Sequence, residues 1–113
     1  MAIQSLEQFQ QTFAAQPVEV KLEQFGKDAV FYLQPLVSAD RDNFEASVVG
    51  VDGKRNLANL RARLVALCLT DADGKQIGSA KQIGSLRADL VGALFDKVRE
   101  LNGMDDEEEA GKD

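Results

Sequence analysis

The central stretch of this 113-residue chain, residues 55–75, reads RNLANLRARLVALCLTDADGK. Its apolar residues recur at intervals of three and four, the spacing of a helix that buries one side. The members of this stripe are Leu57, Leu60, Leu64, Leu67 and Cys68. Arg55, Arg61 and Arg63 lie off the stripe, and the Asp-Gly-Lys turn at 73–75 ends the helix. No side chain here supplies a base, an activated nucleophile or a complete metal site, so the stretch favours a binding protein over an enzyme.

A short amphipathic helix is predicted at the start of the chain. Ser5 and Gln8 form the Ser-x-x-Gln pattern of a capping box, which marks a helix N-terminus. The apolar edge of this helix consists of Leu6, Phe9 and Phe13. Pro17 cannot continue a helix, so the helix is expected to end before it.

A β-hairpin and a second helix are expected next. Residues 18–23 alternate between apolar and charged, which predicts a half-buried strand, and residues 29–33 return as its partner after a turn at 26–28. Ser38 is a favourable helix N-cap, and Phe44 and Val48 lie four positions apart on the helix that follows. Glycines within residues 50–54 are expected to break the chain before the central helix.

The C-terminal third contains a direct repeat and a long helix. The pentapeptide KQIGS occurs at 75–79 and again at 81–85. Two copies are too few for a solenoid, so we expect them to fill a connection, with Ser85 capping the last helix. The stripe of that helix is Leu86, Leu90, Leu94, Val98 and Leu101. The Asn-Gly pair at 102–103 is a C-terminal stop signal, and residues 105–113 are expected to form a disordered acidic tail.

The composition excludes several kinds of site. The single cysteine, Cys68, excludes an internal disulfide and any multi-thiolate metal centre, and its place on the apolar stripe predicts a small buried side chain. The chain has no histidine, the commonest general base and zinc ligand. Its longest apolar run, Leu64–Leu69, is too short to span a bilayer, and its first residues do not form a signal peptide. We therefore expect a cytosolic protein.

The charge is unevenly distributed along the sequence. Residues 54–99 carry nine basic and four acidic side chains, residues 1–53 carry three and eight, and residues 105–113 carry one and six. The basic residues of the middle segment are dispersed and no aromatic residues interleave with them, which makes nucleic-acid binding an unfavoured interpretation. Pairing of the two halves within one chain, or stacking of one subunit on the next, explains the uneven charge distribution better than nucleic-acid binding does.

The sequence contains no complete motif for catalysis or cofactor binding. Aligning Gly74 with the invariant glycine of an EF-hand loop puts Leu69 and Ala80 at ligand positions, so residues 71–74 predict a turn rather than a calcium site. Gly-Lys occurs three times, but never with the spacing of a phosphate-binding loop. The acidic residues at 40–45 are explained by a solvated helix face. We therefore expect no enzyme activity, no cofactor and no metal.

These elements together predict an α+β fold. It is mainly helical, with one N-terminal β-hairpin packed against about four helices. Residues 1–104 are expected to form a single domain, and residues 105–113 the acidic tail.

The order of these elements resembles that of the tail assembly chaperones of long, non-contractile-tailed bacteriophages and related prophages. The resemblance covers roughly residues 18–104. It rests on residues 18–20, 25–26, 30–36, 38–45, 61–69, 71–75 and 94–103. The specific part is the sequence of hairpin, helix, Arg-Leu helix, Asp-Gly-Lys turn and terminal Asn-Gly.

The resemblance implies a non-enzymatic chaperone in the host bacterial cytoplasm that binds the tape-measure protein, helps recruit tail-tube protein and is absent from the mature virion. Self-association along the client and no contact with a membrane are also expected. Two alternatives remain: a minor tail or connector protein of the virion, and, less favoured, a nucleic-acid-binding regulator. Candidate partner-binding residues are Arg61 and Arg63 on the central helix, which could meet an acidic neighbour.

Overall fold

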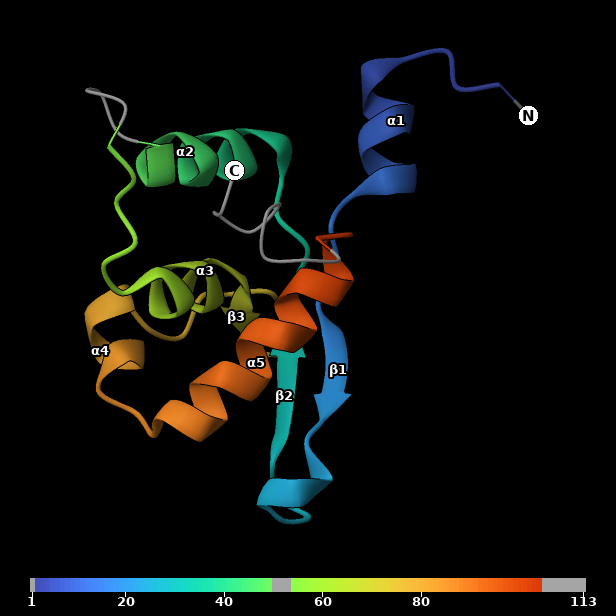
Figure 1. Ribbon diagram of the computed structural model, residues 1–113. Coiled ribbons are helices and arrows are strands. Elements are labelled where there is room, and N and C mark those ends of the chain that lie inside the picture. The colour runs from blue at the N-terminus through green and yellow to red at the C-terminus, as the bar shows by residue number, and fades with distance from the viewer. Residues whose placement is uncertain (1, 50–53, 105–113) are drawn as a thin grey trace.

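The computed structural model describes residues 2–49 and 54–104 and confirms an α+β fold (Figure 1). Its described part contains five α-helices, a short 3-10 helix and three strands. In chain order they are α1 (Leu6–Phe13), β1 (Val18–Lys21), η1 (Glu23–Phe25), β2 (Val30–Leu33), α2 (Ser38–Val49), α3 (Leu60–Cys68), β3 (Leu69–Thr70), α4 (Ala80–Gly84) and α5 (Ala88–Leu101). The predicted chain break at 50–54 falls largely outside the described residues, and the predicted acidic tail lies wholly outside them.

The predicted hairpin is confirmed, and a third strand extends it. β1 and β2 pair antiparallel, with Val18 opposite Leu33 and Lys21 opposite Val30. β3 pairs antiparallel with the other edge of β2, so the strand order is β1-β2-β3. The sequence predicted helix and turn at β3, because two residues carry no recognisable period of their own. β1 is therefore an edge strand.

The core lies between the sheet and the helices, with α3 at its centre (Figure 1). Helices α4 and α5 pack against α3, and α2 flanks it on the side where Phe44 and Val48 are buried, as predicted. The fully buried side chains include Leu22, Leu33, Leu64, Leu94, Met104, Val65, Val98 and Cys68. The predicted stop at Asn102 is also confirmed, since Asn102 is the C-cap of α5 and Gly103 has a φ of 71°.

The central helix is shorter than predicted and buries a wider surface. Asn59 has a φ of 54°, in the left-handed region, so the helix begins only at Leu60. Leu57 precedes it and is 47% exposed, and Leu67 is 37% exposed. The buried residues of α3 are instead Ala62, Leu64, Val65, Ala66 and Cys68. The predicted stripe was wrong at Leu57 and Leu67 because several neighbouring elements enclose α3, whereas the stripe assumed a single buried side.

The repeat segment also differs from the prediction. Its first copy is extended, with Gln76 bridged to Thr70, whereas its second copy forms most of α4. Ser79 and Gln82 make a complete capping box at the start of α4. Ser85 is the C-cap of α4, and so does not cap the last helix.

The last helix starts later than predicted. It begins at Ala88 after Arg87, whose side chain makes no capping hydrogen bond, and Leu86 precedes it and is exposed. Leu94 and Val98 are buried as predicted, together with Val91 and Phe95, which the predicted stripe omitted. The predicted stripe follows a single line of apolar residues three and four positions apart, whereas the neighbouring elements bury a broader side of the helix.

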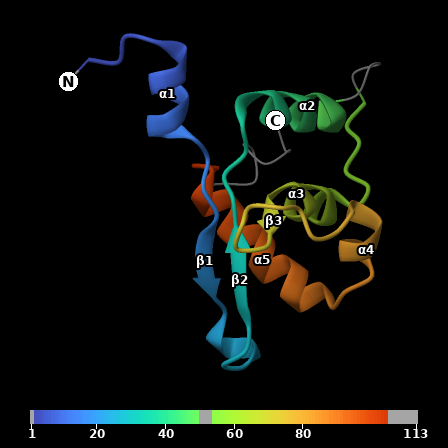
Figure 2. The same ribbon diagram turned by 180° about the vertical axis from the view of Figure 1, so that it is seen from behind.

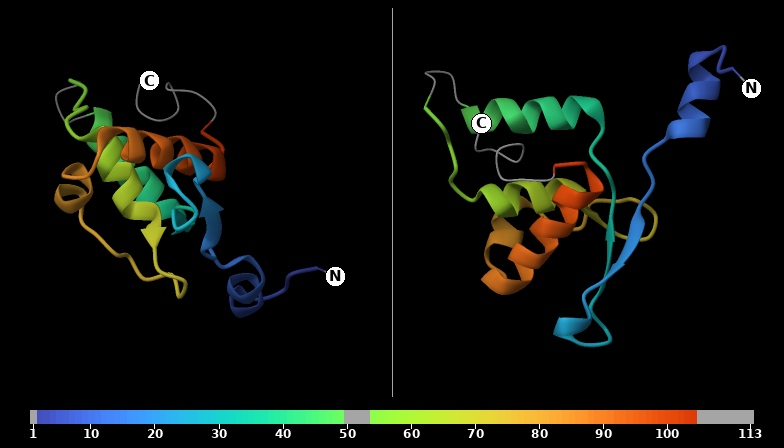
Figure 3. Two further views of the ribbon diagram at one scale, coloured as in Figure 1. Left: turned by 90° about the horizontal axis from the view of Figure 1, so that it is seen from below. Right: turned by 45° about the vertical axis from the view of Figure 1, so that its right-hand side comes forward.

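Helix α1 stands away from the rest of the molecule (Figures 2 and 3). Its start is as predicted, because the Ser5 hydroxyl accepts a hydrogen bond from the backbone N–H of Gln8. The Gln8 side chain, however, accepts from the N–H of Gln4 rather than from that of Ser5. No residue of α1 is buried.

Helix α2 starts at Ser38 itself, so Ser38 is its first residue rather than the predicted N-cap.

Candidate protein-interaction surfaces

Helix α1 presents an exposed apolar face. Leu6, Phe9 and Phe13 are 71%, 53% and 65% exposed, and they share one side of the helix because they are three and four positions apart. The rings of Phe9 and Phe13 lie 5.4 Å apart and tilted at 51°. Ile3 adds a further exposed apolar side chain and, with Leu6 and Phe9, lines a hollow at the start of the helix. An aromatic pair exposed in this way is typical of a protein-binding element.

The charge on α1 is low. Glu7 is the only charged residue of the helix, and glutamine or threonine occupies its remaining polar positions. Contact through α1 would therefore depend on apolar burial rather than on ion pairing. The sequence identified this apolar edge but did not show that the fold leaves it uncovered, since the same pattern is typical of helices that pack on a core.

Arg61, the first of the two predicted partner-binding residues, is exposed on α3. Its guanidinium lies 5.8 Å from the centre of the Phe95 ring of α5. Arg99 lies over the same ring at 5.1 Å and forms a 2.7 Å ion pair with Asp96. Two arginines therefore cluster on the α3–α5 surface, and the sequence did not bring Arg99 into this group because it is 38 positions further along the chain.

Arg63, the second predicted partner-binding residue, makes contacts within the fold. It is half-buried, lies 5.9 Å from the centre of the Phe44 ring and donates from Nη2 to the carbonyl oxygen of Asn56 at 2.8 Å. Its Nε is buried and has no hydrogen-bond partner in the described part of the chain. Arg61 and Arg63 thus face different neighbours, α5 and α2, and the structure does not bring their side chains into one site.

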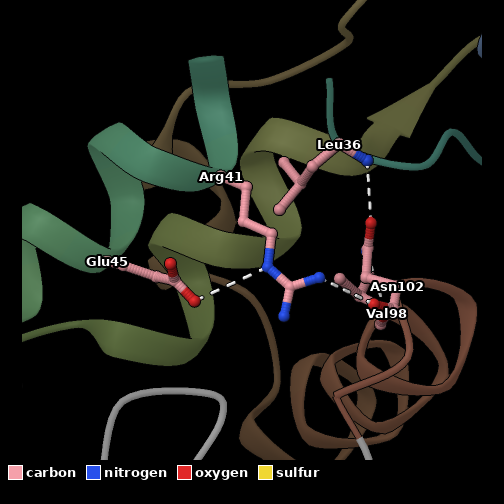
Figure 4. Close-up of polar contacts among 5 residues, drawn as sticks. All are labelled: Leu36, Arg41, Glu45, Val98 and Asn102. Carbon is pink, nitrogen blue, oxygen red and sulfur yellow. Dashed lines mark hydrogen bonds and ion pairs between the residues drawn. The ribbon is translucent and has the colours of Figure 1, made fainter. Parts of the chain in front are cut away.

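A polar joint links α2 to the end of α5 (Figure 4). The Asn102 side-chain oxygen accepts from the N–H of Leu36 at 2.8 Å, and its side-chain nitrogen donates to the carbonyl oxygen of Val98 at 2.9 Å. Arg41 donates to the carbonyl oxygen of Asn102 at 3.0 Å and pairs with Glu45 at 3.5 Å. These contacts connect the segment before α2, and α2 itself, to the C-terminal end of α5.

The remaining polar candidates also have local structural partners. The Asp71 carboxylate accepts from the N–H groups of Asp73 and Lys75, both at 2.9 Å, and so forms the predicted turn. Cys68 is fully buried, and this burial raises the pKa of its thiol to about 11. Within residues 2–49 and 54–104, no three His, Cys, Asp or Glu side chains are placed to hold a metal ion together.

None of the described helices is both long enough and apolar enough to cross a membrane. Comparison of the chain with models of protein families, with curated proteins and with solved structures gives no match.

Proposed function

We propose that this chain is a non-enzymatic assembly chaperone of bacteriophage tails that binds the tape-measure protein and promotes assembly of tail-tube protein around it. The observation that carries the proposal is the amphipathic helix α1, of which no residue is buried. The resemblance in the order of elements supplies the identity of the client. On this proposal the protein acts in the host cytoplasm and is absent from the mature virion.

The physical basis is the burial of apolar surface. A long helical client exposes apolar stripes before it is assembled, and such surfaces aggregate. Packing Leu6, Phe9 and Phe13 against one stripe would remove apolar area from water on both partners, at about 25 cal/mol per Å². The net charge of −6 on the chain would then keep the complex soluble.

Co-expression with the tape-measure protein tests the proposal. The wild-type chain should raise the soluble yield of the client and co-purify with it. Replacing both Phe9→Gln and Phe13→Gln should abolish both effects, because glutamine keeps helix propensity and removes the apolar face. Gln11→Ala, on the opposite side of α1, is the matched control and should behave as wild type.

Mass spectrometry of purified particles separates this function from that of a minor tail or connector protein. A chaperone should be missing from the virion, whereas a structural subunit should be present in fixed stoichiometry. Stoichiometric presence in the virion would replace the proposal with the structural alternative. In the co-expression experiment, a wild-type chain that neither co-purifies with the tape-measure protein nor raises its soluble yield would overturn the proposal.

A further inference from the structure

Among the described residues, β1 lies at the edge of the sheet. β2 pairs with only one side of β1, and within residues 2–49 and 54–104 no strand occupies the other side. Leu22 donates its N–H to the carbonyl oxygen of Ala29 on the β2 side, and successive residues of an antiparallel strand point their backbone groups in opposite directions. The backbone N–H and C=O groups of Val18 and Val20 therefore point toward β2, while those of Glu19 and Lys21 point outward.

These outward groups restrict how a second copy of β1 could pair with the first. In an antiparallel pair, an outward-pointing residue must lie opposite another outward-pointing residue. A register centred on Glu19 would place Glu19 opposite itself, and one centred on Lys21 would place Lys21 opposite itself. Like charges directly opposite each other destabilise a sheet. Both registers are therefore disfavoured.

The register centred on Val20 has complementary charges. It places Glu19 opposite Lys21 of the second copy and, by two-fold symmetry, Lys21 opposite Glu19 of the second copy. Within one chain, Lys21 Nζ and Glu19 Oε1 are 3.9 Å apart, so both side chains already lie on the same face of the sheet. Both are largely exposed, so each can turn to a partner strand without leaving a buried charge.

The other face of the same register is apolar. Val20 lies opposite Val20 of the second copy, and Val18 lies opposite Leu22 of the second copy. Val18 is exposed in the single chain and Val20 is half-buried, so pairing would remove apolar surface from water on this face. The segment Val18–Leu22 is therefore complementary to itself in charge and in polarity.

We infer that two copies of this chain associate through antiparallel pairing of their β1 edges, in the register centred on Val20, into a continuous six-stranded sheet. The inference goes beyond the proposed function and needs no client. Strands of four residues bury little area compared with a standard interface, so we expect a reversible dimer of roughly micromolar affinity.

Charge reversal tests the partner and the register. Glu19→Lys or Lys21→Glu alone should weaken dimerisation about tenfold, because each makes both cross-strand pairs repulsive. The double exchange of Glu19→Lys with Lys21→Glu should restore wild-type affinity, since opposite charges again face each other. Lys27→Glu, in the hairpin turn, is the control and should have no effect. Sedimentation velocity over a concentration series measures each affinity.

Blocking the edge provides a test that preserves the sheet. Glu19→Pro removes an outward N–H that makes no bond to β2, and proline is tolerated on edge strands. The variant should remain monomeric while keeping the thermal midpoint of a wild-type monomer. Dimerisation of Glu19→Pro with unchanged affinity would overturn the inference, as would a wild-type chain that stays monomeric at every concentration.

A cross-link identifies the register directly. Val20→Cys should form a disulfide-linked dimer under mild oxidation, because opposite residues of a non-hydrogen-bonded pair have Cβ atoms about 5 Å apart. The wild-type chain, whose only cysteine is buried, should not cross-link, and neither should Lys27→Cys. Equal cross-linking of Val20→Cys and Lys27→Cys would rule out the proposed register.

Discussion

The side-chain oxygen of Asn102 accepts the backbone N–H of Leu36 at 2.8 Å, across 66 positions of sequence. Leu36 lies between β2 and α2, and Asn102 ends α5, so this bond joins the hairpin side of the fold to its last helix. The sequence signalled Asn102 only as a helix stop. The same residue therefore has a local role in ending α5 and a long-range role in closing the fold.

Replacing Asn102→Ala should lower the free energy of unfolding by about 1–3 kcal/mol. The variant leaves the N–H of Leu36 without its partner in a half-buried setting, which costs more than the net value of a hydrogen bond. It also removes the side-chain bond to the carbonyl oxygen of Val98, which keeps the backbone N–H of residue 102 as a donor. Asn43→Ala, on the exposed side of α2, is the control and should change stability by less than about 0.5 kcal/mol. Urea denaturation monitored by circular dichroism measures both. Equal effects would contradict the long-range role.

Two leucines of α3 should differ sharply when truncated. Leu64 is fully buried, so Leu64→Ala should cost about 2–5 kcal/mol through lost burial and a residual cavity. Leu67 belongs to the stripe read from the sequence but is 37% exposed, so Leu67→Ala should cost less than about 1.5 kcal/mol. Thermal unfolding of the two variants compares them within one helix. A larger loss for Leu67→Ala would favour the stripe over the observed packing.

Serine truncation separates the two ends of α4. Ser79→Ala removes the hydroxyl that accepts the N–H of Gln82, and loss of an N-cap costs about 0.5–2 kcal/mol. Ser85→Ala removes only an exposed bond from its hydroxyl to the carbonyl oxygen of Gln82, so it should cost less than about 0.5 kcal/mol. Chemical denaturation of both variants is the measurement. The reverse order would support a capping role for Ser85 at the last helix.

The repeat shows why local sequence could not fix residues 75–85. The two KQIGS copies are identical, yet one is extended and the other is helical. The second copy follows Ser79, the N-cap of α4, whose hydroxyl accepts the N–H of Gln82. The first copy follows the Asp71 turn, and its Gln76 side chain donates to the carbonyl oxygen of Ala66 on α3. The difference arises from what precedes each copy and from contact with α3, and a pentapeptide contains neither.

The candidate interaction surfaces were predictable only in part. The spacing of Leu6, Phe9 and Phe13 predicted an amphipathic helix, and that helix is present. Whether its apolar side packs on the core depends on where the chain after Pro17 places it, which periodicity does not encode. Arg61 and Arg63 were grouped because they are close in sequence, but positions two apart on a helix point to different sides. Their partners, Phe95 and Phe44, lie on different helices.

The buried thiol of Cys68 should make stability depend on alkaline pH. Burial raises the pKa of the folded thiol from its ordinary value of 9.0, which we expect in the unfolded chain, to about 11. Below that unfolded value both states hold the proton, so the contribution to stability is fully present. As pH rises from about 9 to about 11, only the unfolded state loses its proton, and roughly 2 kcal/mol of stability is lost.

Cys68→Ala isolates this contribution from that of other groups titrating at high pH. Lysine and tyrosine ionisation should affect wild type and variant alike, so the difference between their free energies of unfolding reports the thiol. The variant starts less stable because a buried side chain becomes smaller, and the gap should narrow as pH rises from about 9 to about 11. Urea denaturation at several pH values gives the two curves. Parallel curves would show that the folded thiol titrates like an unfolded one, contrary to its full burial in the core.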